Sequence, residues 1–434
     1  MSAYNKVFFH GPGPGIGDMM RTLDDAGVPF TIKSVENGGF AVEGATLKKN
    51  SGIPHNIILR YTTPNGVNDV PNYKLSPEKA AQEFYDDYSK VLARVPEIVP
   101  FKEHIWIECG NELRTQYDHD DPNFNNMHPA DWLGAWGYHF AQKLATDGWR
   151  VLMFGMNAGT PEPEDWVRPG MRDFLRLCAD EPERYAISLH EGMGLVHFDE
   201  PANNPDTVPF ITGRFEWLYY VCDLLGIARP TTFITEWAWS YNNMPGAGKA
   251  MDDIKWLARY YARFPEVKGI CLWNLISTPA DNVLPGKLSS FISKITEYSL
   301  AARFPDPQQT TPVTAPMRDG ELVVIKVDGS HVPVPEEDDG EVVVSGQDVQ
   351  IQPASLPHTI HLFPQDYSLA EQQRMAAQLY PSRSAFTYSA DLAHLAASNH
   401  PESEVIIWDA ARWQDDILAW FAARGIRCRL KESN

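Results

Sequence analysis

Residues 105–112 read IWIECGNE, an apolar run that stops on an Asn-Glu pair. The run is rich in Ile and Trp, which favour β-structure, and it predicts a strand over residues 105–111. A strand that ends on a carboxylate raises the question of what Glu112 does there. The answer depends on the architecture to which this strand belongs, and similar runs elsewhere in the chain indicate it.

The chain repeats one unit from residue 5 to about residue 304: a short apolar run, a polar or Gly-rich loop, and a helical pattern. The eight predicted strands are KVFF (6–9), FTIKSV (30–35), NIILRYT (56–62), IWIECGN (105–111), VLMFGMN (151–157), AISLHEG (186–192), TFITEWA (232–238) and GICLWNL (269–275). Strands that alternate with helices form a parallel sheet covered by helices. Eight units in roughly 300 residues predict an α/β fold, a (β/α)8 TIM barrel over residues 1–304.

The predicted helix between strands four and five carries an apolar stripe. Its members follow one another at four-residue intervals: Trp132, Trp136, Phe140 and Leu144. This spacing places them on one face of a helix. We expect that face to pack against the barrel wall and to have no catalytic role.

Composition and charge indicate a globular protein that does not bind polyanions. Of 434 residues, 43% are hydrophobic and 12% aromatic, enough for one large core and one or two smaller units. The net charge of -20 repels phosphate backbones and anionic lipids, so neither nucleic acid nor membrane is an expected partner. The N-terminus reaches Gly and Pro before a signal-peptide core forms. We therefore expect a cytoplasmic location, or a secreted one if a leader precedes this sequence.

The alternation of strands and helices stops near Phe304. The Pro- and Thr-rich segment PDPQQTTPVTAP predicts a linker over residues 305–316. Two alternating runs, ELVVIKV (321–327) and EVVVSGQDVQIQ (341–352), predict a small β-unit over residues 317–356.

Residues 357–434 resume the α/β pattern. The predicted strands are TIHLF (359–363), SAFTYS (384–389), EVIIWD (404–409) and IRCRL (426–430), and helical patterns cover 368–380, 390–398 and 413–425. This order predicts a small flavodoxin-like or Rossmann-like α/β sandwich. It contains no catalytic motif, so we expect an accessory domain that serves packing, self-association or a protein partner.

The Gly-rich segment HGPGPGIGD (10–18) follows a predicted strand but does not match a dinucleotide-binding motif. Counted from Gly11 the sixth residue is Ile16, and counted from Gly13 it is Asp18, where the motif requires glycine. Its two prolines also remove backbone N–H donors. We therefore expect a loop at the barrel mouth and no cofactor.

Metal and nucleophile motifs are also missing from the sequence. None of the histidines between strands four and six, which are His119, His128, His139, His190 and His197, has the H-E-x-x-H spacing, so no metal is expected. No G-x-S-x-G elbow is present. The five cysteines are scattered and predict reduced, mostly buried thiols, Cys109 among them.

Two carboxylates lie at the predicted active-site face. Glu112 follows strand four and Glu236 lies in strand seven, and the C-terminal ends of barrel strands form the face that carries catalysis. Strands four and seven lie on opposite sides of the barrel, so the two side chains can converge on one bound sugar. Glycoside hydrolysis needs such a pair, about 5–5.5 Å apart in retaining enzymes and about 6.5–9.5 Å apart in inverting ones. The alternative is that each Glu is a salt-bridged residue at the rim.

The motifs CGNE (109–112), TEWAW (235–239) and LWN (272–274) together resemble clan A of the glycoside hydrolases, the retaining (β/α)8 β-glycosidases. The resemblance covers roughly residues 5–304. It implies hydrolysis of β-linked oligo- or polysaccharide through a covalent glycosyl-enzyme intermediate.

The resemblance also implies roles for single residues. Glu112 would be the acid/base and Glu236 the nucleophile. Asn111 would hydrogen-bond the sugar 2-hydroxyl, and Trp273 would form the platform beneath the sugar in the cleaved subsite. His190, at the end of strand six, matches a place where the clan has a Tyr or His that touches the nucleophile.

Three further residues complete the sequence-based site. Arg60 is a candidate for the Arg that keeps the nucleophile ionised, although the clan carries that Arg nearer strand two. Trp239 opens a loop, residues 239–249, rich in groups that suit sugars, and is expected to bind substrate. Glu108 lies on the same face of its strand as Glu112, one layer deeper, where a structural role is expected.

Two other functions remain open on the sequence alone. The barrel could be a non-catalytic carbohydrate-binding or structural module, or an inverting hydrolase with more widely separated carboxylates. The acidic charge favours a neutral glycan over an anionic one.

Overall fold

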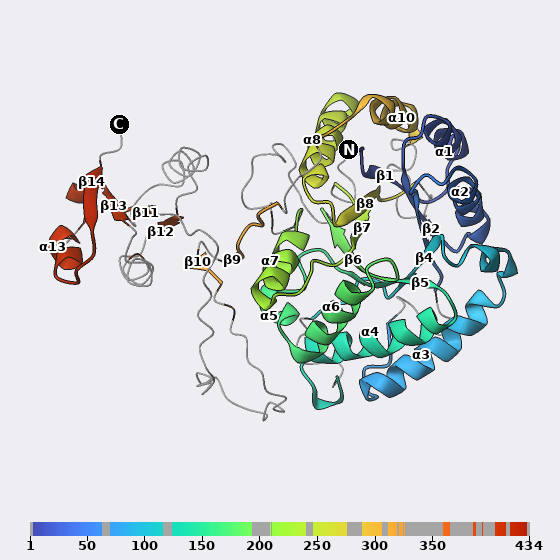
Figure 1. Ribbon diagram of the computed structural model, residues 1–434, viewed down its shortest axis with the longest axis horizontal. Helices are drawn as coiled ribbons and strands as arrows, with labels where there is room; N and C mark the ends of the chain where they lie inside the picture. The colour runs from blue at the N-terminus through green and yellow to red at the C-terminus, as the bar shows by residue number, and fades with distance from the viewer. Residues whose placement is uncertain are drawn as a thin grey trace. The chain divides into compact units, whose positions relative to one another are not determined.

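The computed structural model (Figure 1) divides the chain into two compact units, Met1–Arg318 with Leu322–Gln347, and Asp319–Glu321 with Asp348–Asn434. The structure describes residues 3–62, 70–115, 124–192, 209, 211–239, 246–275, 289–305, 311–318, 321–323, 325, 359–364, 385–387, 393, 404–413 and 417–431.

The first unit is built on a closed barrel in which each strand is hydrogen-bonded to the next and β8 pairs with β1. Its parallel strands are β1 (Val7–His10), β2 (Thr31–Val35), β3 (Asn56–Arg60), β4 (Ile105–Cys109), β5 (Arg150–Met156), β6 (Tyr185–Glu191), β7 (Thr232–Trp237) and β8 (Val267–Leu272). Each observed strand overlaps its predicted run, and the predicted barrel is confirmed.

Helices surround this barrel in the order that the sequence predicts (Figure 1). They are α1 (Ile16–Asp25), α2 (Gly38–Ser51), α3 (Pro77–Leu92), α4 (Pro129–Thr146), α5 (Pro163–Trp166), α6 (Pro169–Asp180), α7 (Phe215–Leu225), α8 (Ala247–Ala262) and α10 (Ile292–Ala301), with 3-10 helices at Pro96–Phe101 and Phe124–Asn126. The stripe on α4 is fully buried, and the Trp136 ring lies 6.5 Å from the ring of Phe154 on β5. The α4 stripe therefore packs on the barrel, as expected.

The barrel interior changes from apolar to polar within one layer. A fully apolar cluster fills it first: Ile58, Trp106, Leu152, Ala186, Phe233 and Cys271. Two residues further along four of these strands stand Arg60, Glu108, Ser188 and Thr235. Because side chains alternate across a strand, residues two apart share a face. The apolar layer is thus the floor beneath a polar layer that opens toward the C-terminal ends of the strands.

A bulge in β7 brings two adjacent residues into the site. Leu189 pairs with Ile234 and the next residue of β6, His190, pairs with Glu236, so Thr235 is an extra residue on β7. The pairing with β8 shows a register shift over the same part of β7. A bulge re-aims side chains locally. Consequently Thr235 and Glu236 both reach interior partners, which regular alternation would not allow.

A second bulge, in β5, makes room near the site. Met153 pairs with Ile187 and Met156 with Leu189, so β5 has one residue more than β6 over this stretch. Gly155 lies there at φ 47°, and a Cβ on it would stand 2.9 Å from the carbonyl oxygen of Gly110. Glycine is therefore required by both conformation and space.

Residues 311–316, which make up most of the described part of the predicted linker, are hydrogen-bonded to the barrel unit. Arg229 Nη1 donates to the Thr311 carbonyl at 2.8 Å. The Thr314 N–H donates to Glu216 Oε2, on α7, at 2.6 Å. These bonds fasten the segment to α7 and to the loop that follows it, which the Pro- and Thr-rich composition did not suggest.

Two short strands, β9 (Met317–Arg318) and β10 (Glu321–Leu322), pair where the small β-unit was predicted to begin. The second predicted run of that unit, residues 341–352, lies outside the described residues.

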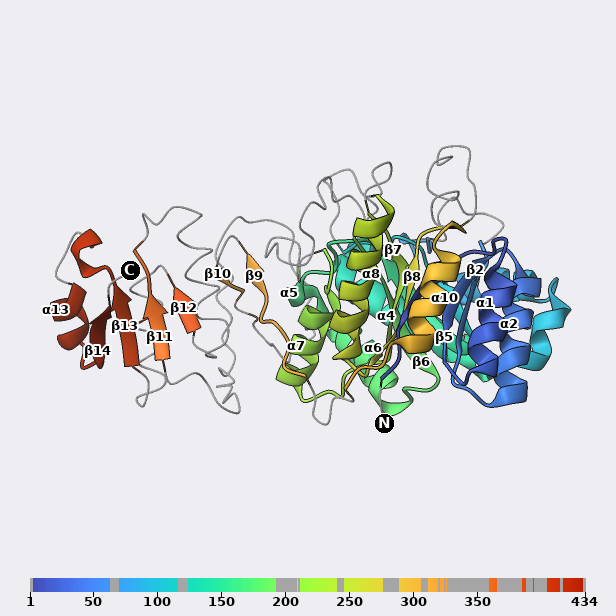
Figure 2. The same cartoon turned by 90° about the horizontal axis from the view of Figure 1, so that it is seen from above.

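The second unit contains a parallel sheet in the order β12-β11-β13-β14 (Figure 2). The strands are β11 (Thr359–Leu362), β12 (Ala385–Thr387), β13 (Glu404–Trp408) and β14 (Cys428–Lys431), each within or overlapping a predicted run. Helix α13 (Ile417–Ala422) packs Ile417 and Phe421 on the sheet, and Ala410–Arg412 form a 3-10 helix. The predicted helices 368–380 and 390–398 lie outside the described residues, apart from Ala393, which joins this core.

Candidate active site

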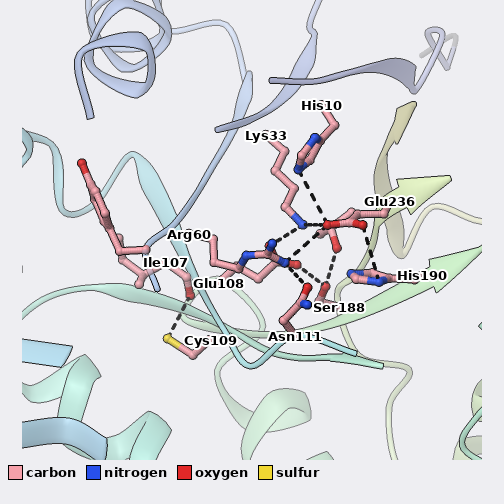
Figure 3. A network of polar contacts seen from close by, with 12 residues as sticks. His10, Lys33, Arg60, Ile107, Glu108, Cys109, Asn111, Ser188, His190 and Glu236 are labelled. Carbon is pink, nitrogen blue, oxygen red and sulfur yellow. Dashed lines mark hydrogen bonds and ion pairs between the residues drawn. The ribbon is translucent and has the colours of Figure 1, made fainter. Parts of the chain in front are cut away.

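Glu236, near the end of β7, is surrounded by basic groups from four other strands (Figure 3). Its Oε1 lies 2.9 Å from Lys33 Nζ on β2 and 3.4 Å from Arg60 Nη1 on β3. His10 Nε2, on β1, is 3.7 Å from the same oxygen, and His190 Nδ1, on β6, is 3.8 Å from Oε2. Residues more than 200 positions apart in the sequence thus meet at one carboxylate.

The positive surroundings determine the charge of Glu236. Burial alone would raise its pKa, but His190, Lys33, His10 and Arg60 together lower the pKa well below its ordinary value. Burial lowers the pKa of His10 to about 3 and that of His190 to about 4, so both rings are neutral near pH 7. We therefore assign to Lys33 and Arg60 the charge that keeps Glu236 ionised at neutral pH.

His10 and His190 are buried, and none of their ring nitrogens has a hydrogen-bond partner among the described residues. An unsatisfied buried polar group is costly, so it calls for an explanation in a native structure. Each neutral imidazole offers one donor and one acceptor beside Glu236. The pair is suited to hydroxyl groups of a ligand placed against this carboxylate.

Asn111 is oriented by Arg60. Arg60 Nη1 donates a short hydrogen bond to Asn111 Oδ1, just after β4. Because the guanidinium can only donate, the amide oxygen must face it and the amide N–H groups must face elsewhere. Arg60 thereby links the end of β4 to Glu236 on β7.

The environment of Glu112 shifts its pKa in the opposite direction from that of Glu236. It is half-buried, in a left-handed backbone conformation with φ 51°. Burial and then the negative charge of Glu236 raise its pKa above the ordinary value. The structure therefore places the two glutamates within electrostatic range, with one carboxyl group biased toward the protonated form and the other toward the ionised form.

Lys33, Glu108 and two hydroxyl groups form a buried network beneath Glu236 that sequence reasoning largely missed. Lys33 Nζ lies 2.7 Å from Glu108 Oε2, and both side chains are fully buried. Ser188 Oγ donates to Glu108 Oε1 at 2.6 Å and lies 2.7 Å from Thr235 Oγ1. Burial would raise the pKa of Glu108, but Lys33 and then Arg60 lower it to about 2. The signal for Lys33 was a charged residue inside the apolar run FTIKSV.

The two tryptophans expected at the site differ in position. Trp273 is partly buried directly after β8, and its peptide bond to Asn274 is cis. Trp239 is only 2% exposed, its Nε1 donates to Asp253 at 3.0 Å, and its ring packs edge-on against Trp237. The expected substrate-binding role of Trp239 stays a prediction; in this structure its ring is enclosed by Trp237 and Asp253.

Two further features of the described residues concern possible metal ligands and thiols. No group of His, Cys, Asp and Glu there has an arrangement that could hold a metal ion. All five cysteines are free thiols, and four of them, including Cys109, are buried. In the same part of the chain no helix is long and apolar enough to cross a membrane.

The loops expected to contact sugars are described only in part. Residues 116–123, 193–208 and 240–245, which make up much of them, lie outside the described residues. In the Gly-rich first loop α1 begins at Ile16, and Gly13 packs near Leu275 after β8. This loop thus lies at the C-terminal end of the barrel.

Comparisons with known proteins yield likenesses in structure only. No family model and no curated protein matches the chain. The barrel is similar to the GH5-4 broad specificity endoglucanase from an uncultured bovine rumen ciliate, with 10% identity, TM-score 0.38, and coverage of 66% of this chain and 86% of that one. The GH5-4 broad specificity endoglucanase from Clostridium acetobutylicum is 13% identical with a TM-score of 0.39, and the match covers 68% of this chain and 96% of that one. A family 5 xyloglucanase from Paenibacillus pabuli is 11% identical with a TM-score of 0.36, and the match covers 68% of this chain and 99% of that one. At these values the likeness assigns no residue a role.

Proposed function

We propose that the chain is a retaining glycoside hydrolase that cleaves β-linked, neutral oligo- or polysaccharides. The observation that carries this proposal is the pair Glu112 and Glu236, which interact electrostatically at the C-terminal face of the barrel and have pKa values shifted in opposite directions. Two titratable groups whose environments separate their pKa values are the arrangement that acid/base and nucleophilic roles require.

In the first step Glu236 acts as the nucleophile. One of its carboxylate oxygens bonds to the anomeric carbon while the glycosidic C–O bond breaks. The bonding electrons go to the leaving oxygen, which takes the proton of Glu112. The raised pKa of Glu112 supports this role, because its carboxyl group retains the proton to higher pH than an ordinary Glu.

In the second step water replaces Glu236 at the anomeric carbon. Glu112, now ionised, takes a proton from the water, whose oxygen bonds to the sugar as the ester bond to Glu236 breaks. Two displacements at the same carbon give a product with the configuration of the substrate.

Neighbouring groups are proposed to position the sugar. The amide N–H groups of Asn111, oriented by Arg60, suit the 2-hydroxyl. The ring nitrogens of His10 and His190, which have no hydrogen-bond partner in the described part of the chain, suit other hydroxyl groups close to Glu236. Trp273 is proposed as the platform beneath the ring. The net charge of -20 disfavours anionic glycans.

The test is removal of the nucleophile. Glu236→Ala should abolish turnover of aryl β-glycosides, and azide should restore part of it by attacking from the vacated side. Glu78→Ala, an exposed carboxylate on α3, is the matched control and should remain fully active. NMR should show that the wild type first releases the β-anomer.

Three outcomes would contradict the proposal. Full activity of Glu236→Ala would exclude Glu236 as the nucleophile. First release of the α-anomer would indicate an inverting enzyme. Binding of oligosaccharide without hydrolysis by the wild type indicates a non-catalytic barrel.

A further inference from the structure

The ammonium group of Lys33 is shared between two carboxylates. Its Nζ lies 2.7 Å from Glu108 Oε2 and 2.9 Å from Glu236 Oε1, and water reaches almost none of the three side chains (Figure 3). Glu108 is in turn held by Ser188 Oγ at 2.6 Å, and Ser188 contacts Thr235 at 2.7 Å. The bulge in β7 allows Thr235 to join this network while Glu236 still reaches the sugar side.

The charges of the two carboxylates change differently during the proposed reaction. Glu236 loses its negative charge when its oxygen becomes an ester with the sugar. Glu108 lies on β4 opposite Arg60 in the strand register, contacts Lys33 at 2.7 Å, and takes no part in bond formation in the proposed reaction. A buried ammonium group with no anion beside it is strongly disfavoured and tends to lose its proton. Glu108 is the anion that remains.

Other titratable and charged groups around Lys33 do not replace Glu108. Those of the surrounding strands are His10 on β1, Arg60 on β3, His190 on β6 and Cys271 on β8. The histidines are neutral near pH 7, Arg60 repels the ammonium group, and burial raises the pKa of the Cys271 thiol so that it stays protonated. Glu112 also interacts electrostatically with Lys33. However, its pKa is raised, and it releases and takes up a proton during the proposed reaction, so it does not carry a constant negative charge beside Lys33.

We propose that Glu108 is a positioning residue that keeps Lys33 cationic while Glu236 is esterified, so that Lys33 can stabilise the carboxylate that leaves in the second step. This inference rests on the proposed function. It separates the two buried glutamates by role: Glu236 reacts, and Glu108 preserves the cation that the departing Glu236 needs. Ser188 fixes Glu108 through its hydroxyl group.

The proposal predicts that loss of the Glu108 charge slows one step more than the other. In Glu108→Gln the amide oxygen can still accept from Ser188, so the shape of the network is kept. At the start of the first step Glu236 is ionised, and its negative charge stabilises the ammonium form of Lys33. In the second step Lys33 has no anion, so the emerging carboxylate of Glu236 is stabilised less.

The experiment uses the full chain and 2,4-dinitrophenyl β-glycosides, chosen from a panel of sugars by wild-type turnover. Their good leaving group makes the first step fast, so kcat reports the second step while kcat/KM reports the first. For Glu108→Gln we expect kcat to fall about 10-fold or more, kcat/KM to change by less than about threefold, and KM to fall with kcat. A pre-steady-state burst of dinitrophenol should accompany these changes.

The pH profile and a second substitution test the cation directly. The alkaline limb of kcat should move to lower pH in Glu108→Gln, while that of kcat/KM should not. Adding Lys33→Arg should restore part of kcat, because a guanidinium group keeps its charge without a nearby anion. Glu191→Gln, a buried carboxylate that does not contact Lys33, is the control and should not separate kcat from kcat/KM.

The outcomes distinguish this inference from the proposed function. If the wild type hydrolyses a glycoside and Glu108→Gln lowers kcat and kcat/KM equally, or leaves both unchanged, the inference is wrong and the proposed function stands. If the wild type hydrolyses none, both fail. If Glu108→Gln does not fold, Ser188→Ala must show the same separation of kcat from kcat/KM in smaller measure; its absence there overturns the inference.

Discussion

The ends of β4 and β7 present the same chemical group with pKa values shifted in opposite directions. At the end of β7 Glu236 is buried among Lys33 and Arg60, and its pKa lies well below the ordinary value. After β4 Glu112 is half-buried, and burial and the charge of Glu236 raise its pKa. The difference shows that burial alone does not determine whether a carboxyl group is ionised. The cations that strands β2 and β3 deliver to one side of the barrel determine it.

The largest expected effect comes from removing the acid at the β4 end. Glu112→Gln should lower kcat/KM by about 10²- to 10⁴-fold on glycosides with poor leaving groups, because protonation of the leaving oxygen is lost. On dinitrophenyl glycosides, which need no protonation, kcat/KM should fall much less. Steady-state kinetics across leaving groups measures this. Equal losses on all substrates would mean that Glu112 does not donate the proton.

A smaller loss of activity is expected when Arg60, which links Asn111 after β4 to Glu236 on β7, is replaced. Arg60→Met should lower kcat/KM by about 100-fold, because Asn111 loses its anchor and Glu236 loses a cation. Arg60 contributes to the lowered pKa of Glu236 and opposes the rise that burial and Glu236 impose on Glu112. Its removal should therefore raise both pKa values and move both limbs of the kcat/KM profile to higher pH. If the two limbs of the kcat/KM profile do not move, Arg60 does not control the ionisation of Glu112 and Glu236.

The smallest effect concerns the backbone that makes room beside His190. Gly155→Ala should reduce the free energy of unfolding by about 1–3 kcal/mol, because φ is 47° and the new Cβ would lie 2.9 Å from the Gly110 carbonyl oxygen. Gly226→Ala is the matched control: φ is 64° but no atom lies within 4 Å, so a cost of only about 1 kcal/mol is expected. Denaturant unfolding measures both. Equal losses would mean that the β5 bulge is not crowded.

Much of the candidate site could be located from the sequence because its signals are local. Apolar runs located the eight strands, and the rule that catalysis occupies their C-terminal ends selected Glu112 and Glu236. Lys33 was missed because a single charge inside an apolar strand does not reveal which strand residues will face it. The burial of Trp239 against Asp253 and Trp237 was not predicted either, because it depends on how α8 packs against the end of β7.

By itself the sequence determined the order of strands and helices, the parallel barrel and the strand ends where carboxylates lie, because these follow from hydrophobic periodicity within short windows. Only the tertiary structure decided which groups meet there. The β7 bulge turns Thr235 and Glu236 to the same interior, against regular alternation, and barrel closure brings Lys33 between Glu108 and Glu236. Charge and proton affinity depend on such distances across strands, which no local pattern contains.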